Sequence, residues 1–139
     1  MTYKRKTWAE KMNPGMQPKI ERTDNAFADI PAGAKMLIAT PSIVEEYIKH
    51  IPKGAHTSLQ QMRKDLATEY RAEYTCPVTS GIFLRIVAEN AYEEYTKGKP
   101  LSKIAPFWRM LDRKSPALKK LSFGTEFVEA QWEKEKLTT

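Results

Sequence analysis

The sequence predicts a mainly α-helical domain with a short β wing, arranged as a winged helix-turn-helix. Two stretches carry apolar residues at helical spacing and follow one another after a short link, which is the pattern of a helix-turn-helix. The stretch after Gly98 is rich in proline and basic residues, and we expect it to form a loop or short strands that make the wing. This domain is assigned to residues 35–139. Residues 1–34 contain scattered charges, prolines and glycines, so we expect an N-terminal arm with little regular structure.

The domain is expected to begin with a short strand and a helix. Residues 35–40 form an apolar run that ends at Pro41, which is compatible with one strand. A capping-box pattern then opens at Ser42, and we expect the helix to run from about Ser42 to His50. The Ile-Pro-Lys-Gly sequence at residues 51–54 ends this helix, because proline and glycine make its continuation costly.

Three further helices are predicted. The first opens with the capping-box pattern of residues 57–60 and has one apolar face, formed by Leu59, Met62, Leu66 and Tyr70. The second begins at Pro77, ends near Lys97 and buries Ile82, Phe83, Ile86, Val87, Asn90 and Ala91. The two are expected to pack through Leu66, Ile82, Phe83 and Ile86. The last helix begins at Gly124-Thr125 and offers Phe127, Val128, Ala130 and Trp132 to the core.

The formal net charge of +6 favours an anionic partner. Residues 97–120 hold eight basic side chains against the single acid Asp112, a local net charge of +7. A second, weaker basic stretch lies in the N-terminal arm, at Lys4, Arg5, Lys6 and Lys11. A solubilising surface has the same composition, so charge alone leaves nucleic-acid binding and simple solvation as equal alternatives.

Several classes of protein are disfavoured by the sequence. No apolar run approaches the ~20 residues of a membrane span, and no apolar segment of a signal peptide follows the basic N-terminus. The single cysteine agrees with a reducing compartment, so we expect a cytoplasmic monomer with no membrane partner. Two histidines and one cysteine show no metal-ligand spacing, and neither a metal nor a cofactor is expected.

Four stretches between about Ser42 and Leu137 resemble, in order, the C-terminal DNA-binding domain of the O6-alkylguanine-DNA alkyltransferase family. The first is Ile-Pro-Lys-Gly at residues 51–54, which is followed by the start of a helix, and the second, residues 78–82, matches the family's recognition helix. The third matches the family's active-site phrase Pro-Cys-His-Arg-Val and reads Pro106-Phe107-Trp108-Arg109-Met110. The fourth is Gly124 with Glu135 eleven residues later. The N-terminal arm is not covered by the resemblance.

This chain departs from the family at the residues that carry the family's chemistry. Leu59 stands in place of the tyrosine that helps to rotate a nucleotide out of the duplex, and residues 78–82 lack the arginine that fills its space. Phe107 and Trp108 replace the methyl-accepting cysteine and its activating histidine. Phenylalanine offers no nucleophile, so the family's alkyl transfer is not expected here. Without the histidine to orient, Glu135 is expected to be an ordinary surface acid.

The resemblance implies a non-catalytic, alkyltransferase-like protein that binds double-stranded DNA, with alkylated or damaged DNA as one candidate target. The candidate DNA contacts are Thr57, Ser58, Thr75, Thr79, Ser80, Arg85, Arg109, Arg113 and Lys114. Pro106, Phe107 and Trp108 either line an aromatic lesion pocket or belong to the core under the wing. The alternative function is a protein-interaction module that kept the fold, lost DNA binding and has a protein partner.

Cys76 is the remaining candidate for catalysis. It precedes Pro77 at a predicted helix N-terminus, a position where a thiol can become reactive. Neither histidine lies near Cys76 in the sequence. An enzyme that uses this thiol is therefore a third hypothesis, behind the two binding functions.

Overall fold

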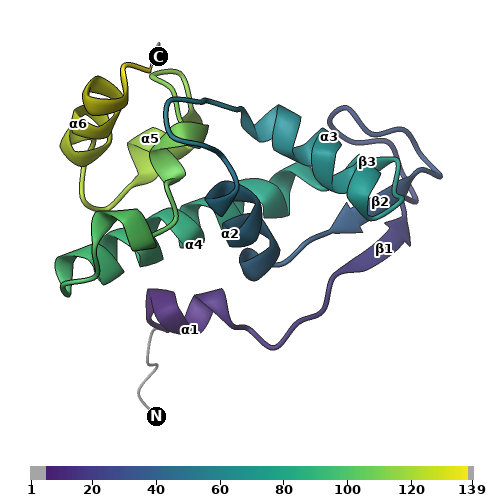
Figure 1. Cartoon of the computed structure of the whole chain (residues 1–139). Helices are drawn as coiled ribbons and strands as arrows, with labels where there is room; N and C mark the ends of the chain where they lie inside the picture. Colours follow the sequence, from purple (N-terminus) through teal and green to yellow (C-terminus); the bar gives the residue numbers. More distant parts are fainter. Residues whose placement is uncertain (1–5, 138–139) are drawn as a thin grey trace.

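The computed structural model describes residues 6–137 and is mainly helical, with a small three-stranded sheet at one end (Figure 1). Its elements follow one another in this order: α1 (Trp8–Met12), β1 (Lys19–Arg22), β2 (Lys35–Ile38), α2 (Pro41–Lys49), α3 (Leu59–Glu69), β3 (Tyr74–Thr75), α4 (Pro77–Thr96), the 3₁₀ helices η1 (Leu101–Lys103) and η2 (Phe107–Met110), α5 (Pro116–Lys120) and α6 (Glu126–Glu135). No helix in the described part of the chain is both long and apolar enough to span a bilayer.

The N-terminal arm contains more regular structure than the sequence predicted. Thr7 and Glu10 close a capping box at the start of α1, with reciprocal side-chain to backbone hydrogen bonds of 3.1 Å. Met12, at the end of α1, is buried in the main core. β1 pairs antiparallel with β2, so a second part of the arm belongs to the sheet. Of the basic residues predicted to mark this arm, Lys4 and Arg5 lie outside the described residues.

The sheet lies at the link between α3 and α4. Its strand order is β1-β2-β3, and β3 runs parallel to β2 with Leu37 opposite Thr75. Two flanking backbone bonds extend this pairing, from Glu73 N to Lys35 O at 2.9 Å and from Cys76 N to Leu37 O at 2.8 Å. The link between α3 and α4 is therefore held against the N-terminal half of the chain.

The short strands considered for the stretch after Gly98 are absent there, and the small sheet is formed by β1, β2 and β3. Among residues 98–137 the structure has no strand and instead forms η1, η2, α5 and α6. Prolines explain part of this difference: Pro100 and Pro106 precede the two 3₁₀ helices, and Pro116 begins α5. Proline has no N–H to donate to a strand ladder, and its fixed φ suits the first turn of a helix.

The predicted helices are present, with small shifts at their first residues. The cap of α2 is Thr40, whose Oγ1 accepts from Ile43 N at 3.3 Å, so this helix begins earlier than Ser42. The cap of α3 is Ser58, whose Oγ accepts from Gln61 N at 3.0 Å. α4 begins at Pro77 as predicted.

The main core surrounds α4, which runs through the middle of the molecule (Figure 1). Phe83 and Val87 are buried as predicted, but Ile82 is 51% exposed and Ile86 is only half-buried. α4 is covered on one side by α1 and α2 and on another by η2 and α5. Because of this coverage, additional residues of α4 are buried: Ser80, Leu84, Ala88 and Glu89.

Candidate functional site

The predicted lesion pocket is a closed aromatic cluster. Phe107 and Trp108 in η2 are 0% and 2% exposed, and Pro106 before them is also buried. The Phe107 and Trp108 rings meet edge to face, with centroids 5.5 Å apart, and Phe107 lies 5.9 Å from Phe123 and Phe127. These side chains therefore form core, and a base has no access to them.

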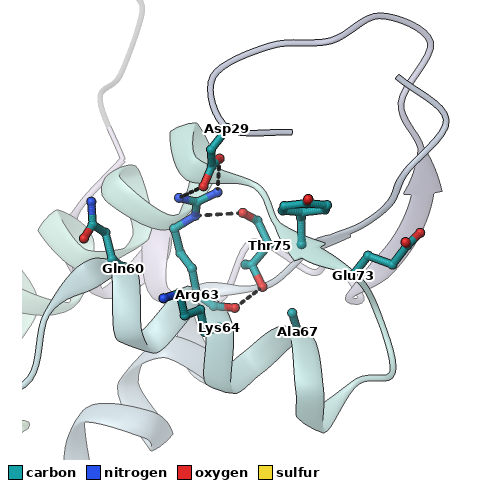
Figure 2. Close-up of a pocket in the computed structure, with 8 residues that line it drawn as sticks. Asp29, Gln60, Arg63, Lys64, Ala67, Glu73 and Thr75 are labelled. Atoms are coloured by element: carbon teal, nitrogen blue, oxygen red, sulfur yellow. Dashed lines mark hydrogen bonds and ion pairs between the residues drawn. The ribbon is translucent and has the colours of Figure 1, made fainter. Parts of the chain in front are cut away.

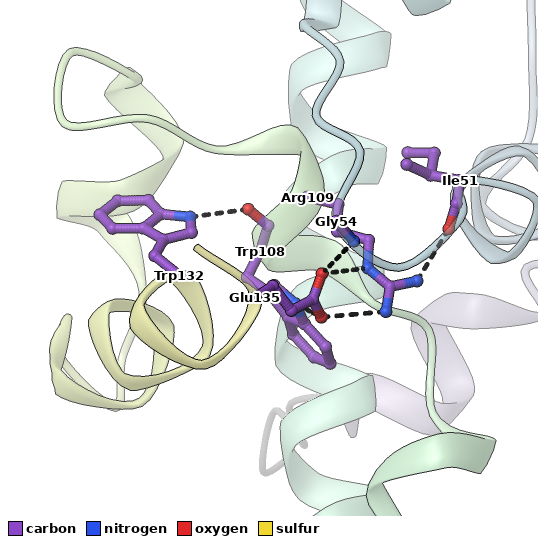
Figure 3. Close-up of polar contacts among 6 residues, drawn as sticks. All are labelled: Ile51, Gly54, Trp108, Arg109, Trp132 and Glu135. Atoms are coloured by element: carbon purple, nitrogen blue, oxygen red, sulfur yellow. Dashed lines mark hydrogen bonds and ion pairs between the residues drawn. The ribbon is translucent and has the colours of Figure 1, made fainter. Parts of the chain in front are cut away.

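Glu135 is the centre of a buried polar cluster (Figure 3). Its carboxylate accepts from Trp108 Nε1 at 2.7 Å, from Arg109 Nε and Nη2 at 2.9 Å each, and from Gly54 N at 3.0 Å. The side chain is only 5% exposed. The expectation that Glu135 is an ordinary surface acid is wrong, because Trp108, Arg109 and Gly54 all donate to its carboxylate.

The charge of Glu135 is stabilised despite its burial. Burial raises the pKa of this carboxyl, but hydrogen bonds from Arg109, Gly54 and Trp108 outweigh that effect and hold the pKa below its ordinary value. Glu135 is therefore a carboxylate at neutral pH.

Arg109 extends the cluster to the turn after α2. Its Nη1 donates to Ile51 O at 2.7 Å, and its side chain is 14% exposed. Trp132 of α6 donates from Nε1 to Trp108 O at 2.8 Å. The turn after α2, the 3₁₀ helix η2 and the helix α6 thus meet at one place (Figure 3). Arg109 is held inside this cluster, which removes it from the candidate DNA contacts.

The cluster contains neither a thiol nor an imidazole. Phe107 has no nucleophilic atom, and an indole nitrogen donates a hydrogen bond but does not accept a proton as imidazole does. Cys76 offers no alternative, because its side chain is 6% exposed and packs against Ile30, Ala34 and Met36.

Two other predicted DNA contacts are also buried. Thr75 is 1% exposed, and its Oγ1 donates to Arg63 O at 2.7 Å. Ser80 is 0% exposed, and its Oγ donates to Cys76 O at 2.6 Å. The Thr75 hydroxyl joins β3 to α3, the Ser80 hydroxyl bonds within the first turn of α4, and both residues are buried. The sequence shows that these residues are small and polar, but it does not show whether their side chains point to the surface or to the interior.

The remaining predicted polar contacts have different surroundings. Ser58 is exposed at the cap of α3, and Thr57 before it is half-buried, with its N–H bonded to Arg109 O at 2.9 Å. Thr79 is half-buried, and its Oγ1 has no hydrogen-bond partner among the described residues.

An open groove follows the outer side of α4 and has a volume of about 690 Å³. We call it the α4 groove. Its lining contains three cations and no acid, and consists of Trp8, Lys11, Leu59, Pro77, Val78, Gly81, Ile82, Leu84, Arg85, Ile86, Met110, Ser115, Pro116, Ala117 and Lys120. Val78 and Ile82 are 60% and 51% exposed there, one helical turn apart. The groove therefore combines exposed apolar side chains with three cations.

α1 forms one wall of the α4 groove. Lys11 Nζ lies 4.2 Å from the centre of the Trp8 ring, and the Arg85 guanidinium lies 5.7 Å from it. Arg85 also lies 3.9 Å from the buried Glu89 carboxylate, which is itself bonded to Ser122. Sequence analysis missed Trp8, although the Thr7–Glu10 capping box was a signal that α1 is an ordered helix.

Arg113 and Lys114 are exposed but do not line the α4 groove. Arg113 lies 3.5 Å from Glu129 and over the Trp132 ring, 5.4 Å from its centre. Of the predicted DNA contacts, Arg85 is the one that lines the groove. The basic stretch is thus divided, with Lys120 in the groove and Arg113 beside the acidic face of α6.

No protein-family model matches this chain, and comparisons with curated proteins and with solved structures found no match either.

Proposed function

We propose that this chain is a non-catalytic DNA-binding protein that contacts duplex phosphates from the α4 groove. The observation that supports this proposal is the lining of the groove, which contains Lys11, Arg85 and Lys120 and no acidic side chain. Phosphate contacts by Lys and Arg supply most of the sequence-independent affinity of DNA-binding proteins. The resemblance of the sequence to alkyltransferase-like DNA-binding proteins remains part of this proposal.

The direction of the helices around the groove adds to its positive potential. Leu59 in the first turn of α3 and Pro77 in the first turn of α4 both line the groove. The N-terminal end of a helix carries a partial positive charge, which favours anions nearby. Recognition of alkylated DNA by Phe107 and Trp108 is not part of the proposal, because both side chains are buried.

Fluorescence anisotropy with a labelled duplex at several salt concentrations tests the proposal. Binding is expected to weaken steeply with salt, and Lys11→Ala combined with Lys120→Ala is expected to make the slope shallower by up to about two units of log affinity against log salt. Arg113→Ala combined with Lys114→Ala removes the same charge outside the groove and is the matched control. A wild-type chain that does not bind at low salt contradicts DNA binding.

A protein-interaction module is the second candidate function, and the exposure of Val78 and Ile82 favours it. Two large apolar side chains exposed one turn apart in a groove are typical of a surface that receives apolar side chains of a partner. The two functions differ in their response to Val78→Ser combined with Ile82→Ser. If the groove binds DNA through phosphate contacts, this variant keeps the salt slope of duplex binding. If the groove binds a protein through Val78 and Ile82, the variant loses binding to that protein partner.

A further inference from the structure

A second pocket lies on the other side of the start of α3 (Figure 2). It has a volume of about 600 Å³ and is lined by Asp29, Gln60, Arg63, Lys64, Ala67, Glu73, Tyr74 and Thr75. We call it the Arg63 pocket. Leu59 and Pro77 line the α4 groove, whereas Gln60 and Thr75 line the Arg63 pocket. The two hollows therefore flank the same part of the helix-turn-helix.

Arg63 is fixed in this pocket by the backbone of β3. Its Nε donates to Thr75 O at 2.9 Å, and Thr75 Oγ1 donates back to Arg63 O at 2.7 Å. These two bonds hold the base of the guanidinium in place. They leave Nη1 and Nη2 directed into the pocket as a fork of two donors (Figure 2).

The carboxylate of Asp29 occupies this fork. Asp29 Oδ1 accepts from Nη2 at 2.8 Å and Oδ2 from Nη1 at 3.2 Å, and the Arg63 side chain is only 12% exposed. A phosphate group accepts the same pair of parallel hydrogen bonds from arginine. Asp29 thus stands where a phosphate fits by geometry and charge.

The exchange of this carboxylate for another anion does not require the loop to unfold. Asp29 lies in the loop between β1 and β2, and its side chain is 60% exposed. The neighbouring Ile30 is 2% exposed, and its backbone exchanges hydrogen bonds of 3.0 and 2.9 Å with Phe27. The loop backbone is therefore anchored by Ile30, and rotation of one exposed side chain is enough to free the arginine fork.

We propose that Arg63, with Gln60 and Lys64 beside it, is a second phosphate-binding site for the DNA backbone, and that Asp29 occupies it in the free protein. This inference rests on the proposed DNA-binding function. Gln60 and Lys64 are exposed next to Arg63. The other acid of the pocket, Glu73, lies away from the fork (Figure 2), where its Oε1 accepts from Lys35 N at 2.9 Å. Displacement of Asp29 therefore leaves the Arg63 fork free for a phosphate, with Lys64 as a second cation in the pocket lining.

Asp29→Asn tests this site, with Asp24→Asn as the matched control. Both substitutions remove one negative charge from the same loop, and Asp24 is exposed. In the anisotropy experiment, Asp29→Asn is expected to bind the duplex several-fold more tightly than Asp24→Asn. Equal affinities for the two variants overturn the inference.

A second substitution separates the fork from general electrostatics. Arg63→Lys in the Asp29→Asn background keeps the charge but removes the paired donors, so the gain in affinity is expected to disappear. Lys64→Gln in the same background leaves the bonds to Thr75 intact and is expected to lower the slope, which provides a readout if Arg63→Lys unfolds. A gain that survives both changes overturns the site. If the wild type binds the duplex but Asp29→Asn equals its control, this inference fails while the proposed function stands; no binding by the wild type defeats the proposed function itself.

Discussion

Trp108 and Glu135 are joined by a hydrogen bond of 2.7 Å between the indole Nε1 and Oε2 of the carboxylate. The indole N–H donates this hydrogen bond, but an indole does not accept a proton as an imidazole does. Arg109 binds the same carboxylate with two nitrogens, so the pair is part of a structural junction between η2 and α6.

Removal of the Glu135 carboxylate is expected to destabilise the fold strongly. Glu135→Ala leaves Arg109, 14% exposed, without its carboxylate, and the expected loss is about 3–5 kcal/mol in the free energy of unfolding. Glu133→Ala, at an exposed position of the same helix, is the control and is expected to change stability little. Urea denaturation measures both. Similar midpoints for the two variants would show that the cluster contributes little.

The same carboxylate is expected to make stability depend on pH. Its pKa in the folded chain lies below the ordinary 4.5, so the bonds are fully present above that value and are lost as pH falls toward the folded pKa. The difference in unfolding free energy between wild type and Glu135→Gln is expected to be constant between about pH 7 and pH 5 and to shrink below that range. The contributions of the other carboxylates cancel in this difference, because wild type and variant share them. A difference that grows on acidification contradicts the assignment.

The packing of α4 can be tested with two neighbouring residues. Phe83 is 7% exposed, and Phe83→Ala is expected to cost about 3–5 kcal/mol of stability. Ile82 is 51% exposed, and Ile82→Ala is expected to change stability by less than about 0.5 kcal/mol. Thermal unfolding of the two variants gives the comparison. Equal losses would mean that the rotation of α4 about its axis differs from the one described.

The chain is expected to show no stoichiometric dealkylation of O6-methylguanine in DNA. Phe107→Cys alone is expected not to restore transfer, because Trp108 cannot take the thiol proton and the site is buried. Incubation with an alkylated oligonucleotide followed by intact mass spectrometry measures the reaction directly. An added alkyl mass on the wild-type chain would overturn the non-catalytic proposal.

Local sequence signals predicted most of the helices. Pro77 at the first turn of α4 and the Ile-Pro-Lys-Gly turn after α2 act through backbone geometry, which does not depend on distant contacts. Ile82 was predicted to be buried but is exposed, and this error comes from contacts between distant parts of the chain. Its exposure depends on which helices cover α4, and a single apolar residue within a largely apolar helix does not reveal that arrangement.

The polar site depends on contacts that are distant in sequence. Glu135 binds Gly54 across 81 positions, and Asp29 reaches Arg63 across 34. Neither pair has a local sequence pattern, because the sequence alone does not distinguish a buried acid from an exposed one. For Phe107 and Trp108, the sequence left open whether the pair lines a pocket or belongs to the core. The packing of Phe123 and Phe127 against Phe107 shows that it belongs to the core.

The composition of β1 has a consequence for self-association. β1 is an edge strand whose four residues are all exposed, and three of them are charged: Lys19, Glu21 and Arg22. It covers the side of β2, where Met36 and Leu37 are buried. Another chain that added a strand to this edge would have to align itself with a row of charges, which opposes aggregation. Deletion of the arm would leave β2 as an open apolar edge, so the N-terminal segment protects the folded chain from intermolecular β-sheet growth.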